Sequence, residues 1–219
     1  MDFGEQKELL VEYVNDDSLD RWDDVTRGRY LNIWYQKMLN EHDWIFTQDI
    51  DSSILTTPNV AVYAKPTLVQ KILGVYITVN GYRNKVSYIN RKQRDSLPQG
   101  STGIPRHYNL LGDNIFLHPT PDQPYYVTIE YSASIPNMAA ESDEPIFDEA
   151  FHYLIPLGAA VSLKGTSGGS QINEGSALTQ EYLAGMERMK NKLLPGEDDR
   201  PDGVINVIDI NGRDMFGYT

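Results

Sequence analysis

The stretch Gly103-Ile104-Pro105-Arg106-His107-Tyr108, together with Ile115-Phe116-Leu117-His118-Pro119-Thr120-Pro121-Asp122, indicates the fold class of this chain most directly. Both segments combine strand-forming residues with Gly and Pro, whose backbone angles end strand pairing. No catalytic spacing explains either segment. We therefore interpret them as two short strands that end in tight turns, and we expect a β-sheet in the middle of the chain.

A sheet extending from about Thr47 to Met138 is predicted around these two segments. Residues Gly74–Val79 place a β-branched residue at every second position, which is the period of a half-buried strand. Asn80-Gly81 follows directly and favours a hairpin, because both residues tolerate positive φ, so Tyr82–Ile89 is the expected return strand. Five or more short antiparallel strands indicate a small sheet or sandwich. The remaining strands are expected at Tyr108–Leu110, Ile115–Leu117 and Tyr126–Tyr131.

The chain before the sheet has a helical pattern from Glu5 to Asn40, where apolar residues recur three and four positions apart. Asn15-Asp16-Asp17-Ser18 interrupts this pattern and supplies side-chain oxygens of the kind that cap helices. We therefore expect two helices here, and the second is expected to begin near Leu19 or Asp20.

Two more helices are expected after the sheet. Asp143-Glu144-Pro145 precedes an apolar pattern from Ile146 to about Leu163, and acidic residues and Pro are typical of a first helical turn. The glycine-rich segment Gly165–Ser170 then breaks the pattern. A final helix is predicted from about Gly175 to Leu194, and Pro195-Gly196 ends it.

This order of elements predicts an α+β fold rather than a doubly wound one. Residues 1–46 and 143–194 are expected to form one helical bundle domain from the N-terminal and C-terminal helix pairs. Residues 47–142 are expected to be an inserted domain, an antiparallel β-sheet or sandwich. Residues 195–219 are predicted to be an extended C-terminal tail, in which Val204–Ile210 has high β-propensity. Such a terminal strand either adds to the sheet edge of another protein or folds back onto its own sheet.

Composition and charge exclude several classes of protein. The 219 residues contain no cysteine, which excludes disulfides, thiolate zinc sites and cysteine nucleophiles. The formal net charge of −12 disfavours a protein that wraps nucleic acid, since Lys and Arg must neutralise phosphates. The same charge suits a channel wall along which DNA slides, although acidity most often only maintains solubility. We expect a soluble protein without a membrane partner, because we find neither a secretory signal nor an apolar run of ~20 residues.

The residue types that most often carry chemistry occur in uninformative patterns. The glycine-rich Gly165–Ser170 lacks the Lys of a phosphate-binding loop. Neighbouring carboxylates such as Asp143-Glu144 and Asp198-Asp199 are typical of solvated loops rather than of calcium or acid–base sites. We therefore expect no enzyme activity and no catalytic, cofactor-binding or metal-binding residues. Four histidines share no metal-ligand spacing and are expected at the surface or in interfaces: His42, His107, His118 and His152.

A series of segments forms an ordered pattern along the chain. Its members are the helix Arg29–Tyr35 with Trp44 after it, the strands around Gly103–Tyr108, Ile115–Asp122 and Tyr126–Tyr131, then Asp143-Glu144-Pro145, and Met186–Lys190 in the last helix. Before these strands, Val60–Pro66 is similar to the Tyr-Ala-Leu-Pro motif that precedes a valine-rich strand in the family named below. This chain has Lys65 where the members of that family usually have leucine. Taken together, about residues 20 to 194 resemble the head–tail adaptor (connector) proteins of tailed bacteriophages.

The resemblance implies a structural subunit of the virion, located at the head–tail junction and made in the cytoplasm of the bacterial host. About twelve copies are expected to form a homo-oligomeric ring, since head-to-tail contacts between identical subunits close when the rotation permits. The ring is expected to bind the portal protein, to extend the channel through which double-stranded DNA passes without specific binding, and to attach tail or nozzle proteins. Portal-binding residues are expected in the C-terminal tail: Val204, Ile205, Val207, Ile208, Ile210, Met215, Phe216 and Tyr218.

Two other functions remain open from the sequence. A tail or baseplate accessory β-module that binds carbohydrate or protein would present exposed aromatic side chains clustered on one face of the sheet. A hydrolase would need two carboxylates that converge in a pocket, and a sequence does not show convergence.

Overall fold

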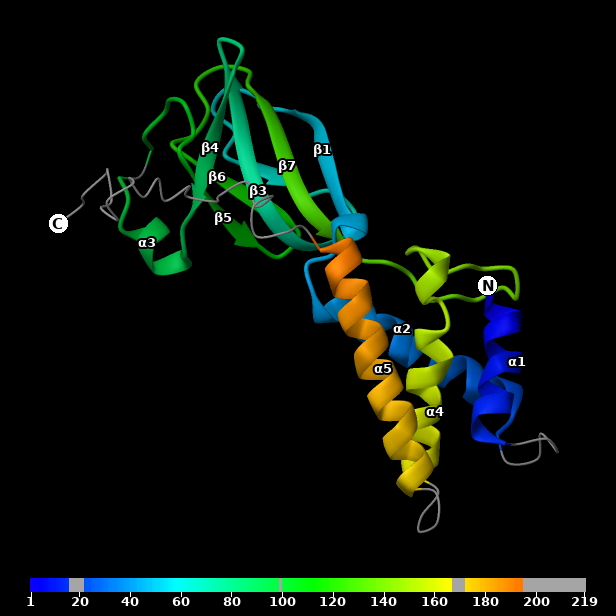
Figure 1. The fold of residues 1–219 in the computed structure, drawn as a ribbon. Coiled ribbons are helices and arrows are strands. Elements are labelled where there is room, and N and C mark those ends of the chain that lie inside the picture. The colour runs from blue at the N-terminus through cyan, green and yellow to red at the C-terminus, as the bar shows by residue number, and fades with distance from the viewer. Residues whose placement is uncertain (16–21, 99, 167–171, 195–219) are drawn as a thin grey trace, which may run out of the picture.

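The computed structural model describes residues 1–15, 22–98, 100–166 and 172–194 (Figure 1). Within these ranges the chain forms five α-helices and one curled, seven-stranded sheet, so the fold is of the mixed α+β class that the sequence predicts. The helices are α1 (Phe3–Val14), α2 (Asp24–Glu41), α3 (Arg91–Asp95), α4 (Leu154–Thr166) and α5 (Ile172–Leu193), with short 3₁₀ turns at Ile45–Thr47 and Glu149–Phe151. Four helices lie at one end of the molecule, and the sheet with α3 lies at the other (Figure 1).

The second helix begins later than its hydrophobic pattern predicts. We expected it to begin near Leu19 or Asp20, whereas α2 begins at Asp24. The Asp23 carboxylate accepts a hydrogen bond from the Thr26 N–H at 2.7 Å, and this N-cap satisfies one of the donors that a helix start leaves unpaired. The cap therefore decides where α2 begins.

The predicted helix from Ile146 to Leu163 is also shorter than expected, because α4 begins only at Leu154. The Asp143 carboxylate accepts hydrogen bonds from the backbone N–H groups of Ala139 and Ala140, at 2.6 and 2.8 Å. These donors precede Asp143 in the chain, so its side chain stabilises a turn before it and does not cap a helix after it.

One cluster of buried side chains holds the four long helices together. α4 packs against α1, α2 and α5, and α1 also contacts α2. Trp34 of α2 lies at the centre of these contacts: its indole N–H donates to the Ser162 hydroxyl at 2.9 Å, and its ring meets that of Tyr182 edge-on at 5.0 Å. Gly158 allows α4 to approach this indole closely, since a Cβ at that position would collide with the ring.

The seven strands form a single sheet in the order β1-β7-β3-β4-β5-β6-β2. β3 and β4 form the hairpin that Asn80-Gly81 predicts, and both turn residues have positive φ. One expectation is wrong: β4 and β5 pair in parallel, whereas the sequence predicted a wholly antiparallel sheet. α3 and the segment after it return the chain along β4, which makes the parallel pairing possible. The strands are β1 (Gln48–Leu55), β2 (Val62–Ala64), β3 (Val69–Val79), β4 (Tyr82–Tyr88), β5 (His107–Leu111), β6 (Asn114–His118) and β7 (Tyr126–Ala133).

The two segments that indicated the sheet lie along β5 and β6 and the turns beside them. Residues 103–106 precede β5, and Gly103 has a φ of 151°, a conformation that other residues rarely adopt. Thr102 and Thr120 form an isolated bridge that closes this end of the sheet. Residues of the strands, together with Tyr125 just before β7, form a second buried cluster: Val75, Ile77, Val86, Tyr108, Ile115, Leu117, Tyr125, Val127, Ile129 and Tyr131.

Candidate interaction surfaces

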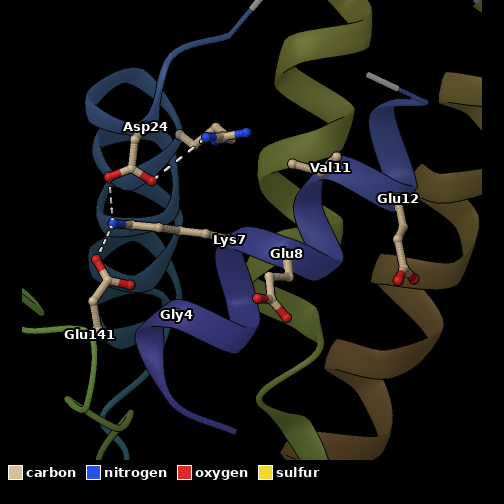
Figure 2. A pocket seen from close by; sticks show the side chains of 8 residues that line it. Gly4, Lys7, Glu8, Val11, Glu12, Asp24 and Glu141 are labelled. Atoms are coloured by element: carbon tan, nitrogen blue, oxygen red, sulfur yellow. Dashed lines mark hydrogen bonds and ion pairs between the residues drawn. The ribbon is translucent and has the colours of Figure 1, made fainter. Parts of the chain in front are cut away.

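An open groove with a cavity volume of ≈ 490 Å³ lies between α1, the start of α2 and the segment after β7. Figure 2 shows the side chains that line it. We call it the acidic groove, because carboxylates are the most numerous charged groups of its lining: Gly4, Lys7, Glu8, Val11, Glu12, Asp24, Arg27 and Glu141.

Lys7 joins the three segments that form the acidic groove. Its ammonium lies 2.8 Å from a carboxylate oxygen of Asp24 and 2.6 Å from one of Glu141 (Figure 2). The same ammonium lies 4.7 Å from the centre of the Phe3 ring, which adds a cation–π contact. Although Lys7 belongs to α1, its partners come from α2 and from the segment after β7, so this ion pair network fixes how the three segments meet.

The pKa of Lys7 is raised, which is typical of a structural cation and not of a reactive amine. Burial opposes the charged form, but the hydrogen bonds from Lys7 to Asp24 and Glu141 outweigh burial and raise the pKa of Lys7. A catalytic lysine needs the opposite shift, because only the neutral amine is a nucleophile or a base.

The carboxylates of Glu8 and Glu12 are not used in this network. Both side chains are exposed, stand one helical turn apart on α1, and are not directed at Lys7 (Figure 2). Within the ranges that the structure describes, neither forms an ion pair, whereas Asp24 also lies 3.7 Å from the guanidinium of Arg27. The acidic groove therefore presents two exposed carboxylates along one wall, and no ion pair within the described ranges neutralises them.

A surface of the opposite charge surrounds α3. Residues 82–112 contain six Lys or Arg and a single Asp, although the whole chain carries a net charge of −12. Arg91 is 81% exposed, and Lys92 and Arg106 are exposed as well. We call Arg91, Lys92 and Arg106 the basic surface. The backbone carbonyl of Arg106 accepts from the Ser87 N–H at 2.9 Å, so Arg106 is held against β4, the strand that precedes α3.

The sequence around α3 explains why its cations point outward. Asn90 and Gln93 form a capping box, in which each side chain accepts a hydrogen bond from the other residue's backbone N–H at 2.9 Å. Arg94 anchors the turn, because its guanidinium lies 2.7 Å from Asp95 and 5.6 Å from the centre of the Phe116 ring of β6. The short helix is thus attached to the sheet through Arg94, and Arg91 and Lys92 remain in solvent.

Comparison with known proteins identifies the family to which this chain belongs. The sequence model of the SU10 adaptor protein family matches residues 1–206 of this chain. The chain belongs to the SU10 adaptor protein family. A comparison with curated proteins found no match. Membership confirms the resemblance read from the strand and turn segments, and it places the protein among the structural components of bacteriophage particles.

The adaptor family is a structural, non-catalytic class of protein. In the part of the chain that the structure describes, no three His, Cys, Asp or Glu side chains lie close enough to hold a metal ion. The pKa of Asp143 is lowered because its carboxylate accepts the N–H groups of Ala139 and Ala140, so this side chain stabilises a turn and stays ionised. No helix among the described residues is long and apolar enough to cross a membrane.

One histidine of the adaptor is placed differently from the sequence expectation. His152 is 2% exposed and lies in the core, so its expected surface or interface position is wrong. Its two ring nitrogens lie 2.8 Å from the Phe147 carbonyl oxygen and 3.0 Å from that of Met1. His118 and His107 face each other across β5 and β6, and burial together with the neighbouring His107 lowers the pKa of His118.

Three exposed tyrosines of the sheet are divided between its two faces. Tyr82, Tyr88 and Tyr126 are 76%, 56% and 62% exposed. Tyr126 pairs with Thr78 and shares its face, whereas Tyr82 pairs with the next residue, Val79, and lies on the opposite face. Tyr82 and Tyr88 share a face of β4 but stand six residues apart, so these three side chains do not form the compact cluster that a carbohydrate-binding module needs.

Strand β1 is an outer strand of the sheet, and its own side chains protect it. The Ile50 N–H donates to the Asp49 carboxylate at 2.8 Å, and the Ser53 N–H donates to the Asp51 carboxylate at 2.7 Å. The pairing of β1 with β7 also shifts register after Asp51. Occupied donors, a bulge and acidic side chains all disfavour the addition of another strand. The predicted portal-binding residues, from Val204 to Tyr218, lie outside the described residues.

Proposed function

We propose that this adaptor protein is a subunit of a ring at the head–tail junction, where it docks on the portal, extends the DNA channel and provides the surface for tail attachment. The observation that carries this proposal is the family match over residues 1–206, which spans the helices, the sheet and the start of the C-terminal tail. Its partners are then other copies of the chain, the portal protein and the tail or nozzle proteins. We place the ring in the virion, after synthesis in the bacterial cytoplasm.

In this proposal the chain has two domains with different tasks. Residues 1–46 and 143–194 form a helical bundle that acts as the rigid wall of the ring, and residues 47–142 form the inserted β domain. The presence of two clusters of buried side chains, one built mainly by helices and one by strands, supports this division.

The overall charge supports the role in DNA passage. With a net charge of −12, a ring of about twelve copies carries a large negative charge, so its lumen repels the phosphates of double-stranded DNA. DNA then moves through the channel without being bound.

The C-terminal tail is the proposed portal-docking segment. Its apolar residues between Val204 and Ile210, together with Phe216 and Tyr218, supply strand-forming and aromatic anchors within a chain that is otherwise rich in charge. The protected edge of β1 is consistent with a tail that pairs with another protein rather than with this edge.

Copurification with the portal protein of the same genome tests this function. We expect the full chain to be retained on immobilised portal rings, and a chain that lacks Val204–Thr219 to be lost from them while its circular dichroism spectrum is unchanged. The control is the Asp198→Asn/Asp199→Asn variant, which keeps every apolar tail residue and is expected to bind. Equal retention of the truncated chain would refute the role of the tail, and failure of the full chain to bind would refute the adaptor function.

A further inference from the structure

The charges of this chain are separated along its sequence. Residues 1–24 contain nine Asp or Glu against two Lys or Arg, whereas residues 82–112 contain six Lys or Arg against one Asp. A chain with mixed charge usually intersperses the two signs on its surface, because this avoids large fields of one sign. The separation produces an acidic end and a basic end in one molecule.

The fold places α1, from the acidic end, and α3, from the basic end, on opposite flanks. Figure 1 shows α1, which forms one wall of the acidic groove, and α3, which carries the basic surface, at opposite sides of the molecule with the long helices between them. They therefore cannot neutralise each other within one copy. Because the two surfaces lie on opposite sides, one copy can contact the next through them, and the same contact can repeat from copy to copy in one direction.

We propose that the acidic groove of one copy binds the basic surface of the next copy, head to tail, and that this contact builds the ring. The inference rests on the proposed function, because it assigns the contact between neighbouring subunits of that ring. The occupant of the groove is a second copy of this chain, and its Arg91 and Lys92 meet the carboxylates of Glu8 and Glu12.

Charge complementarity carries this assignment. Glu8 and Glu12 are exposed, one turn apart and without an ion-pair partner in the described ranges, while Lys7 and Arg27 are already occupied inside the groove. On the other side, Arg91 is 81% exposed, and its one ion pair among the described residues is a loose contact with Asp95, at 4.0 Å. Each surface thus offers unused charges of the sign that the other lacks, and opposite potentials steer association and fix register.

Both surfaces also contain apolar area that a contact would bury. Val11 lies between Glu8 and Glu12 on the wall of the acidic groove, and Tyr88, 56% exposed, precedes α3 on the basic side. A contact that combines a few charge pairs with an aromatic or aliphatic anchor has the composition of a protein–protein interface.

Charge reversal in the full chain tests the contact, because a heterologous interface allows complementation between two defective variants. Glu8→Lys/Glu12→Lys makes the groove basic, and Arg91→Glu/Lys92→Glu makes the basic surface acidic. Each variant alone opposes like charges, whereas an equimolar mixture restores both contacts in an alternating assembly. The control, Asp113→Lys/Glu187→Lys, changes the net charge by as much as the groove variant, at exposed positions on the turn between β5 and β6 and on α5.

Sedimentation velocity gives the readout, at about 0.02 M and about 0.5 M NaCl, where the Debye length falls from roughly 20 Å to roughly 4 Å. We expect the wild-type chain and the control to self-associate at low salt, and to associate at least about tenfold more weakly at high salt. Each reversed variant is expected to remain monomeric with an unchanged melting curve. The equimolar mixture is expected to assemble in a 1:1 ratio.

Three results would overturn the contact: a wild-type chain that stays monomeric at low salt, a reversed variant that associates like the wild type, or a mixture that does not recover. If the basic reversal leaves association intact but abolishes binding to a DNA duplex, the basic surface belongs to nucleic acid and the contact is also refuted. A failure of this contact is distinguishable from a failure of the proposed function, since portal copurification of the wild-type chain tests that function separately.

Discussion

Removal of one buried hydroxyl group, by Tyr182→Phe, is expected to stabilise this protein. Tyr182 of α5 is 6% exposed, and its ring packs edge-on against Trp34 at 5.0 Å. Its hydroxyl is buried and has no hydrogen-bond partner among the described residues. A buried hydroxyl without a partner costs about 1–3 kcal/mol, while phenylalanine retains the ring contact. Because the lost oxygen leaves a small gap, we expect a net gain of about 1 kcal/mol in the free energy of unfolding.

A second buried tyrosine of the same core provides the matched control. The Tyr35 hydroxyl accepts a hydrogen bond from the Ile146 N–H at 3.2 Å, and the residue is 2% exposed. Tyr35→Phe removes the same oxygen but leaves a backbone donor without its partner, so we expect a loss of about 1 kcal/mol. The two substitutions are chemically identical and should change stability in opposite directions.

Urea unfolding followed by far-ultraviolet circular dichroism measures both effects. For an m-value of about 2 kcal/mol/M, the unfolding midpoint should rise by about 0.5 M for Tyr182→Phe and fall by about 0.5 M for Tyr35→Phe. Equal losses for the two variants would refute the reasoning, because the Tyr182 hydroxyl would then have a stabilising contact.

The same tyrosine makes stability depend on alkaline pH. Burial, with a smaller contribution from Glu41, raises the pKa of Tyr182 well above its usual range. In the unfolded chain the phenol ionises near its ordinary pKa of about 10. Above that pH the unfolded state binds fewer protons than the folded state, so stability falls as the pH rises. The fall should be shallower in Tyr182→Phe, and an identical slope in both proteins would contradict this.

Two further substitutions test the contacts that join the helices. Gly158→Ala should destabilise the protein by about 1–2 kcal/mol, because the new Cβ would collide with the Trp34 indole and this overpacking costs more than the gain in helix propensity. Thermal unfolding measures the loss of stability, and an unchanged midpoint would argue against the close approach. Lys7→Met should lower the free energy of unfolding by about 1 kcal/mol at low salt and by less at high salt, because the partner carboxylates of Asp24 and Glu141 are exposed and salt screens them. A loss that does not depend on salt would assign the effect to packing instead.

Local signals in the sequence predicted the centre of the sheet well. Asn80-Gly81 specifies a hairpin through its own backbone preferences, and the structure has β3 and β4 on either side of it. Strand β1 was not predicted as a separate element, because Gln48–Leu55 is polar and mostly exposed and lacks the alternation of a half-buried strand. It is a strand because it pairs with β7, and that pairing partner lies far away in the sequence.

The acidic groove was missed for a similar reason. Lys7 lies on the buried stripe of α1 with Phe3, Leu10 and Val14, and a lysine in such a position signals a buried ion pair. Its partners Asp24 and Glu141 are 17 and 134 residues away, so only the fold identifies them. The excess of Lys and Arg between residues 82 and 112 was visible in the sequence, but its position opposite α1 was not.

Electron cryomicroscopy of the assembled virion tests the central claim most directly. We predict a closed ring of this chain between the portal and the tail, with α1 of each subunit against α3 of its neighbour and the DNA channel passing through the centre. The adaptor function would be contradicted if the chain were found in the baseplate or in a tail fibre, or were absent from the head–tail junction.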